Sequence, residues 1–240
     1  MPKRIINAHV ASLPYYRGRA PINWAIINGE EKVGVTVHYI EEGIDTGPII
    51  VQEEVEVNPK DRAIDLLLKT LPLFPKLVVE AVTLIEEGRV HPIPQEEFSG
   101  SYFPRRVPED GLIDWYHENS LEIYNKVRAL ADPYPGAFIV YNDQKIVVER
   151  AALPEVSAQR KVSPLPGLVF GKSSSGGVKV TTIDGCVMLE ELSIEGQCYK
   201  AGEYFRMGSR LAVNPLQEVL ALKAQLAAMK GEKGDTSLIS

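Results

Sequence analysis

The pattern that most limits how this chain folds lies close to its start. The run Ile5-Ile6-Asn7-Ala8-His9 is a short apolar strand that ends in two polar side chains. A polar loop containing Pro14 and Gly18 follows, and Pro21 then begins an apolar helix, because proline is well tolerated in a first helical turn. An asparagine and a histidine at a strand end, facing a basic loop, indicate a functional site and not a core.

A second polar turn follows further along the chain. The segment Glu41-Glu42-Gly43-Ile44-Asp45-Thr46-Gly47-Pro48 places a carboxylate in a tight turn between two β-rich runs. We expect Asn7, His9 and Asp45 to meet in the folded chain. An Asp-Thr-Gly turn also occurs in aspartic proteases, which need two such turns to pair their carboxylates. This chain has one, so only a homodimer would serve, and the surrounding helical patterns argue against that class.

The composition is that of a globular protein. The chain has 240 residues, of which 45% are hydrophobic and 24% charged, enough for one large or two small domains. A net charge of −6 argues against a chain-wide surface for nucleic acid, but leaves a local basic patch open. The sequence lacks an uncharged apolar run of about 18 residues, which predicts no membrane span. Cys186 and Cys198 have no metal-site spacing, so we expect reduced thiols and a cytoplasmic protein.

Residues 1–100 show the pattern of an α/β domain. Residues 33–39 are β-branched and alternate, and residues 48–57 predict a second strand or strand pair. Apolar residues at helical spacing over 64–71 predict a helix, which Pro72 and Pro75 interrupt. A second helix is expected over 73–87, ending at Gly88.

Residues 89–110 are rich in proline and charge, and predict a linker and domain boundary. A second domain is expected over 101–214, with a helix over 120–131 that Ser120 caps. Short β-type runs then alternate with Gly, Pro and Ser turns, which predicts a small barrel or sandwich. These runs are residues 137–141, 145–151, 167–170, 178–182 and 186–193. Residues 215–240 are expected to form a C-terminal helix, to about residue 229, and a tail.

Several motifs, in order along the chain, resemble the folate-dependent formyltransferase family. They are Asn7-x-His9, Leu13-Pro14-x-x-Arg17-Gly18, Pro21-x-Asn23-Trp24-Ala25, Gly34-Val35-Thr36, Asp45-Thr46-Gly47, Asp114-Trp115, Val127-Arg128-Ala129 and the segment from Asp132 to Phe138. The resemblance implies an α/β fold, with the C-terminal half of a Rossmann-like formyltransferase domain followed by a small OB-like β-barrel. It also implies that the N-terminal part of the catalytic domain, about three βα units, is missing.

Within the family, the segment Arg17-Gly18-Arg19-Ala20-Pro21-Ile22-Asn23-Trp24 is most similar to the sugar N-formyltransferases, especially the type acting on UDP-4-amino-4-deoxy-L-arabinose. The tRNA enzymes tend to carry a basic residue where Trp24 stands. The resemblance therefore implies transfer of a formyl group from 10-formyltetrahydrofolate to the amine of a nucleotide-linked amino sugar. Two alternatives stay open: a methionyl-tRNA formyltransferase, and a truncated, non-catalytic binding or interaction protein.

The resemblance assigns catalysis to Asn7, His9 and Asp45, and the residue chemistry agrees. Formyl transfer needs a neutral amine and stabilisation of an oxyanion. Histidine changes charge near neutral pH and can take the amine proton, an asparagine amide can donate to the oxyanion, and an aspartate can orient the histidine. No metal is required.

Other residues fall into a supporting group. Arg17, Arg19 and Asn23 are expected to bind substrate, because guanidinium groups suit phosphate. Tyr15, Tyr16 and Trp24 are expected to pack within the fold, and Arg105-Arg106 to lie in a solvated linker, with substrate contact as the alternative for each. His38, His91 and His117 have no evident partner in the sequence and are expected to be structural.

Two departures from the family pattern carry expectations. Family members usually have serine two residues after the histidine, whereas Ala11 stands there and Ser12 follows, so the loop is expected to pack differently. If the chain begins at Met1, Ile5-Ile6 forms an exposed sheet edge, and such edges tend to be covered. A homodimer, or docking of a separate N-terminal half, is the expected cover.

Overall fold

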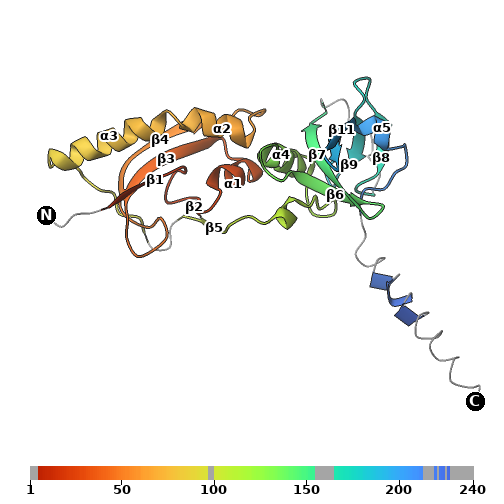
Figure 1. The fold of residues 1–240 in the computed structure, drawn as a ribbon, viewed down its shortest axis with the longest axis horizontal. Helices are drawn as coiled ribbons and strands as arrows, with labels where there is room; N and C mark the ends of the chain where they lie inside the picture. The colour runs from red at the N-terminus through yellow and green to blue at the C-terminus, as the bar shows by residue number, and fades with distance from the viewer. Residues whose placement is uncertain are drawn as a thin grey trace, which may run out of the picture.

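The computed structural model describes residues 5–96, 100–154 and 165–212, together with 219, 220, 222–224, 226 and 227. The first half contains both strands and helices (Figure 1). Its elements are β1 (Ile6–His9), β2 (Arg17–Gly18), α1 (Pro21–Ile27), β3 (Lys32–Tyr39), β4 (Ile49–Glu56), α2 (Ala63–Thr70) and α3 (Leu73–Glu86).

A three-stranded antiparallel sheet in the order β1-β3-β4 organises this half. Val35 and Val37 on β3 are fully buried, as expected for a central strand. They pack with Ile50 of β4 and with Leu73 and Leu77 of α3 in one apolar cluster. Figure 1 shows α3 lying along the sheet, so this face is covered by a helix. Ile5, at the start of β1, is 68% exposed, and the cover expected at this edge stays a prediction.

The prolines act as the sequence predicts. Pro72 precedes the first residue of α3, and Pro75 lies in its first turn, where the missing N–H costs no helical hydrogen bond. The helix ends before Gly88, whose φ of 68° is the left-handed conformation that glycine adopts without strain.

A connecting segment carries β5 (Tyr102–Phe103) and a 3₁₀ turn, η1 (Pro108–Gly111). The second half begins with α4 and continues as a sheet in the order β6-β7-β10-β9-β8, with β11 also paired to β10. Its elements are α4 (Ser120–Leu130), β6 (Ala137–Tyr141), β7 (Gln144–Ala152), β8 (Val169–Lys172), β9 (Val178–Thr181), β10 (Cys186–Ile194), β11 (Gln197–Lys200) and α5 (Ala201–Tyr204). An α/β unit followed by a small β domain confirms the expected fold class.

The two halves share one core. Ile26 of α1, Leu66 of α2 and Ile123 of α4 belong to the same buried cluster as Val148 and Leu192 of the β domain. Figure 1 accordingly shows α4 between the first sheet and the β domain. The division into residues 1–100, 101–214 and 215–240 stays a prediction.

One helix boundary differs from the sequence prediction. The N-cap of α4 is Asn119 and not Ser120: the Asn119 side chain accepts from the Glu122 N–H at 2.9 Å, and Glu122 accepts in return from the Asn119 N–H. Ser120 instead donates through both its N–H and its hydroxyl to Asp184. A contact between residues 64 positions apart is not readable from local sequence.

The sequence also missed β2, β5, β11 and α5, which are at most four residues long. Most of the expected C-terminal helix lies outside the described residues, although those described between 219 and 227 are helical. In the described part of the chain, none of the helices has the length and apolar character needed to cross a membrane.

Candidate active site

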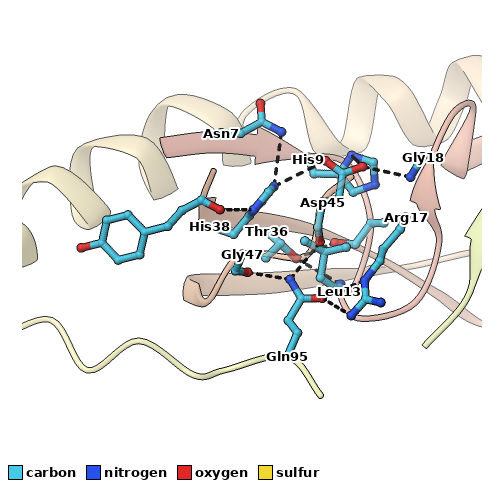
Figure 2. Close-up of polar contacts among 12 residues, drawn as sticks. Asn7, His9, Leu13, Arg17, Gly18, Thr36, His38, Asp45, Gly47 and Gln95 are labelled. Atoms are coloured by element: carbon cyan, nitrogen blue, oxygen red, sulfur yellow. Dashed lines mark hydrogen bonds and ion pairs between the residues drawn. The ribbon is translucent and has the colours of Figure 1, made fainter. Parts of the chain in front are cut away.

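The structure brings the three predicted catalytic residues to one place (Figure 2). Asn7 and His9 lie two residues apart on β1, so both side chains point to the same face of the strand. Asp45 stands in the turn between β3 and β4 with a φ of 53°, a conformation uncommon for residues other than glycine. Its Oδ2 lies 3.7 Å from His9 Nδ1. Residues with an uncommon backbone conformation, as Asp45 has, are found often at functional sites.

The Asp45 carboxylate is held in its charged form. Burial alone raises its pKa, but hydrogen bonding with His38, the Gly18 N–H at 2.9 Å and the charge of His9 together outweigh burial. The pKa of Asp45 is thereby lowered from 3.8 to about 2. Its side chain is only 13% exposed, so this is a shielded negative charge beside two histidines.

A hydrogen bond to Tyr16 defines which ring nitrogen of His9 carries a proton. Its Nε2 lies 2.8 Å from the carbonyl oxygen of Tyr16, and a carbonyl only accepts, so Nε2 carries a proton. Nδ1 is then the nitrogen that faces Asp45. A proton arriving at Nδ1 is stabilised by the adjacent carboxylate, which suits His9 to accept a proton from a substrate.

His38, for which the sequence shows no evident partner, lies against two of the three predicted catalytic residues. Its Nδ1 lies 2.8 Å from the Tyr39 carbonyl, while its Nε2 lies 3.3 Å from the Asn7 amide nitrogen and 3.6 Å from Asp45 Oδ1. His38 therefore connects Asn7 to Asp45, as Figure 2 shows. The strand over 33–39 was predicted, but only the pairing register, which sets Asn7 opposite His38, reveals this contact.

Polar side chains of the sheet fix the loop that follows His9. Thr36 Oγ1 donates to the Ala11 carbonyl at 2.6 Å and accepts from the Leu13 N–H at 3.3 Å. Gln52 donates to both the Leu13 carbonyl and Thr36 Oγ1. Ser12 also binds β4, because its hydroxyl donates to Glu54 at 2.8 Å. The loop is thus held from the sheet by Thr36 and Gln52.

Gln95 fixes the Asp45 turn from the opposite side. Its Nε2 donates to the carbonyl oxygens of Asp45 at 3.0 Å and Gly47 at 2.7 Å. Its Oε1 accepts from Arg17 Nε at 3.1 Å and Nη2 at 2.8 Å. Arg17 is only 8% exposed, so these contacts make it a brace for the turn. Gln95 lies in a proline-rich segment that gave no sequence signal for this contact.

The remaining predicted substrate residues lie in different environments. Asn23 is buried in α1, and its amide donates to the Ala129 carbonyl of α4 at 2.7 Å. Arg19 is exposed beside the site, and its backbone N–H donates to the Phe103 carbonyl. Among the three, only the Arg19 side chain is presented to solvent, so substrate contact stays a prediction that the geometry favours for Arg19 alone.

An aromatic stack lies directly next to the site. β2 pairs in parallel with β5, which sets Arg17 opposite Tyr102 and Gly18 opposite Phe103. Tyr16 stacks on Phe103 with ring centroids 4.8 Å apart, and Trp24 leans on the same ring at 5.2 Å. Tyr16 and Trp24 thus pack within the fold, as expected, whereas Tyr15 is 57% exposed, so the packing predicted for it was wrong.

A basic side chain completes this stack. The Arg106 guanidinium lies 5.1 Å above the Trp24 ring. Its buried Nη1 has no hydrogen-bond partner among the described residues. Arg106 is therefore part of a built surface and not simply a solvated linker residue.

A cavity of about 240 Å³ opens on the loop that follows His9. It is lined by Val10, Ala11, Ser12, Tyr15, Tyr16, Pro21, Ala25, Glu30, Lys32, Val33 and Glu54. Tyr16 links it to the site, because its ring lines the cavity while its carbonyl binds His9. Burial and a hydrogen bond to Glu30 raise the pKa of the Tyr16 phenol, so the hydroxyl stays protonated at neutral pH.

Comparison with known proteins covers both halves of the chain. Residues 1–82 match the formyl transferase family model, and residues 106–209 match the model of the formyl transferase C-terminal domain. The methionyl-tRNA formyltransferase of Desulforamulus reducens is 36% identical over 195 residues, which are 81% of this chain and 60% of that protein. The methionyl-tRNA formyltransferase of Synechococcus sp. is 33% identical over 224 residues, covering 90% of this chain and 68% of that protein.

A sugar enzyme is among the similar solved structures. The N-formyltransferase from Helicobacter canadensis, in complex with folinic acid and dTDP-3-aminofucose, has a TM-score of 0.57 and 27% identity, covering 81% of this chain and 66% of that one. It supports the family fold but lies further from this chain in sequence than the two methionyl-tRNA formyltransferases.

These relatives overturn the amino-sugar function expected from the sequence, since the methionyl-tRNA formyltransferases are 33–36% identical over most of the chain. The expectation relied on residues 17–24 and 132–138, and Trp24 was its most specific residue. Trp24 packs between Phe103 and Arg106, so it reports local packing and not the acceptor. This chain spans only 60% of the length of the Desulforamulus reducens protein. The two family models nevertheless match both halves of this chain. The chain belongs to the formyl transferase family.

Proposed function

We propose that this chain contains the reaction centre of a methionyl-tRNA formyltransferase, which transfers a formyl group from 10-formyltetrahydrofolate to the amine of methionyl-tRNA. The observation that carries the proposal is the convergence of Asn7, His9 and Asp45, with His38, inside a chain of this family. The two relatives that bear the name methionyl-tRNA formyltransferase support tRNA as the acceptor.

The donor set of the site fits a formyl carbonyl. The Asn7 amide has two N–H donors and lies 3.3 Å from His38 Nε2 through its nitrogen, so an N–H is available to the formyl oxygen. 10-Formyltetrahydrofolate would supply an activated formyl group. The folate in the complex of the H. canadensis relative supports this donor.

Proton transfer falls to His9 and Asp45. The reaction breaks the bond between the formyl carbon and the donor nitrogen, forms one to the acceptor amine, and moves a proton from the acceptor to the donor nitrogen. His9 Nδ1 accepts the amine proton, and the Asp45 carboxylate at 3.7 Å stabilises the resulting positive charge. His38 and Gly18 keep Asp45 ionised for this task.

The exposed side of the aromatic stack offers a surface for the acceptor. Arg19, Tyr102 and Arg105 are exposed there, and Arg106 stands over Trp24. Stacking on aromatic rings together with arginine contacts is a common way to hold single-stranded nucleic acid ends. Gly18 ties this surface to Asp45, because its N–H binds the carboxylate while its strand pairs with Phe103.

The test is formyl transfer by the complete polypeptide, purified from its own source, to methionyl-tRNA and in parallel to UDP-4-amino-4-deoxy-L-arabinose. We expect activity on methionyl-tRNA alone. His9→Ala should lower kcat by about 10²–10⁴-fold, the usual contribution of an acid–base group. His117→Ala is the matched control, because His117 is exposed and bonds only to Asp114 among the contacts described.

Each other outcome has a meaning. Transfer to the amino sugar without transfer to methionyl-tRNA would refute the acceptor. Wild-type protein that transfers to neither, at any folate concentration, would favour the non-catalytic interaction protein. Equal activity of His9→Ala and His117→Ala would remove His9 from the mechanism.

A further inference from the structure

The largest cavity among those described lies away from the residues of the candidate active site. It measures about 470 Å³, within the range of small-molecule pockets. Its walls come from the segment before α2, from α4, and from β7 and β10. Figure 1 shows α2, α4 and β7 close together where the two halves join. The lining residues are Lys60, Arg62, Tyr124, Val127, Arg128, Glu149, Arg150, Ala151, Ala152 and Glu190.

The lining carries four basic and two acidic side chains, although the chain as a whole has a net charge of −6. Arg150 is already compensated, because its Nε lies 2.8 Å from Glu190 and its Nη2 lies 2.9 Å from Glu191. In the described part of the chain, no ion pair joins Lys60, Arg62 or Arg128 to a carboxylate. Lys60, Arg62 and Arg128 thus line the cavity without a direct ion pair, although the charge of Asp61 acts on Arg128 and that of Arg62 on Glu191. The one other lining carboxylate, Glu149, has no ion pair among the described residues either, so cations outnumber carboxylates in the lining.

Arg128 distinguishes this cavity from a cluster of charges on the surface, because its side chain is buried. It is only 9% exposed, and its guanidinium is fixed by neutral acceptors: Asn125 Oδ1 at 2.9 Å and the Asp61 carbonyl at 2.9 Å. The Asp61 carboxylate is occupied by Lys69 and by the Asn58 N–H. Buried charges in proteins are normally paired. A fixed guanidinium that lines a cavity without an ion pair is therefore suited to bind an anion.

Tyr124 shapes the wall beside this charge. Its ring lies 5.8 Å from the Arg128 guanidinium carbon, and its hydroxyl donates to the Pro59 carbonyl at 2.9 Å. That bond ties α4 to the segment carrying Lys60 and Arg62. The flexible side chains of Lys60 and Arg62 are exposed and can close on a ligand that the rigid Arg128 receives.

We propose that this cavity binds a phosphate group, with Arg128 as the fixed contact and Lys60 and Arg62 as the mobile ones. Guanidinium and ammonium groups match phosphate in charge and in hydrogen-bond geometry. The phosphate belongs either to a small phosphorylated molecule or to the backbone of an RNA substrate. Only the second source rests on the function proposed above.

The experiment compares Lys60→Gln/Arg62→Gln with Lys76→Gln/Arg89→Gln, using the complete polypeptide. Both double variants remove two exposed positive charges, and the control pair lies on or after α3, outside the cavity lining. In the first arm, pyrophosphate is titrated by calorimetry. In the second, binding of methionyl-tRNA is measured over a range of salt concentrations.

For a small-molecule phosphate, we expect the cavity variant to lose about 10-fold or more in pyrophosphate affinity, the scale of lost charge-assisted hydrogen bonds, while the control stays near wild type. For an RNA phosphate, the slope of log K against log salt should fall by about 1 to 2 in the cavity variant but not in the control. If the two variants behave alike in both arms, the phosphate site is refuted. If wild type binds no tRNA, the proposed function fails, and the pyrophosphate arm alone decides the site.

Discussion

His38 Nε2 lies 3.6 Å from Asp45 Oδ1, on the opposite side of the carboxylate from His9. Hydrogen bonding with His38 is the largest of the contributions that keep Asp45 ionised against the effect of its burial. Asp45 therefore stands between two imidazoles, one predicted from the sequence and one that only the fold supplied.

The first prediction concerns this contact. His38→Leu fills this buried position with an apolar side chain and removes the contacts with Asn7 and Asp45. The pKa of Asp45 should rise above about 2, because desolvation is then opposed by fewer partners. An NMR titration of the Asp45 carboxyl carbon measures the change. His91→Leu, at an exposed position, is the control, and an unchanged Asp45 titration in His38→Leu would reduce His38 to a packing role.

A second prediction concerns acid stability. The pKa of Asp45 is lower in the folded chain than its ordinary 3.8, so the charged form stabilises the fold above that pH. The contribution, on the order of 2 kcal/mol, is lost as the pH falls from about 4 through about 2. Asp45→Asn has no charge to lose. Urea unfolding at pH 5 and pH 2.5 should therefore show a smaller drop in unfolding free energy for the variant than for wild type, and equal drops would contradict the ionised site.

The third prediction uses a glycine that the site requires. Gly18 has a φ of 97°, and a Cβ there would lie 2.3 Å from the Phe103 carbonyl oxygen. Gly18→Ala must move β5 or the Gly18 N–H that binds Asp45. Gly88→Ala is the matched control, because Gly88 also has a positive φ of 68° but nothing within 4 Å of the added atom.

In thermal or urea unfolding, Gly88→Ala should cost about 1 kcal/mol for its backbone strain alone. Gly18→Ala should cost at least about 2 kcal/mol, because steric overlap adds to the strain. An equal loss of unfolding free energy in the two variants would mean that β2 and β5 move apart without disturbing the site.

The fourth prediction separates binding from structure at Asn23. Removing its amide leaves the buried Ala129 carbonyl without the donor that joins α1 to α4. Asn23→Ala should lower the unfolding free energy by about 1 to 3 kcal/mol, the cost of an unsatisfied buried group. Asn28→Ala, at the exposed end of α1, is the control and should cost less than about 1 kcal/mol. A rise in KM for the tRNA acceptor without loss of stability would instead restore the substrate role expected from the sequence.

The sequence by itself determined the elements and the central trio. Alternating β-branched residues predicted β3, Pro72 and Gly88 bracketed α3, and turn residues separated five of the six strands of the β domain. Asn7, His9 and Asp45 stood out because polar side chains at a strand end and in a tight turn have no core to fill. These signals are local, so a single sequence carries them.

The tertiary structure decided which residues serve the site and which serve the fold. Strand register brought His38 to Asp45, and the path of the connecting segment brought Gln95 to Arg17, contacts that span 7 and 78 positions in the chain. Packing turned Asn23 and Trp24 from expected determinants of the substrate into supports of α1. The burial of a side chain and its hydrogen-bond partners depend on residues elsewhere in the chain, so the local sequence pattern does not predict them.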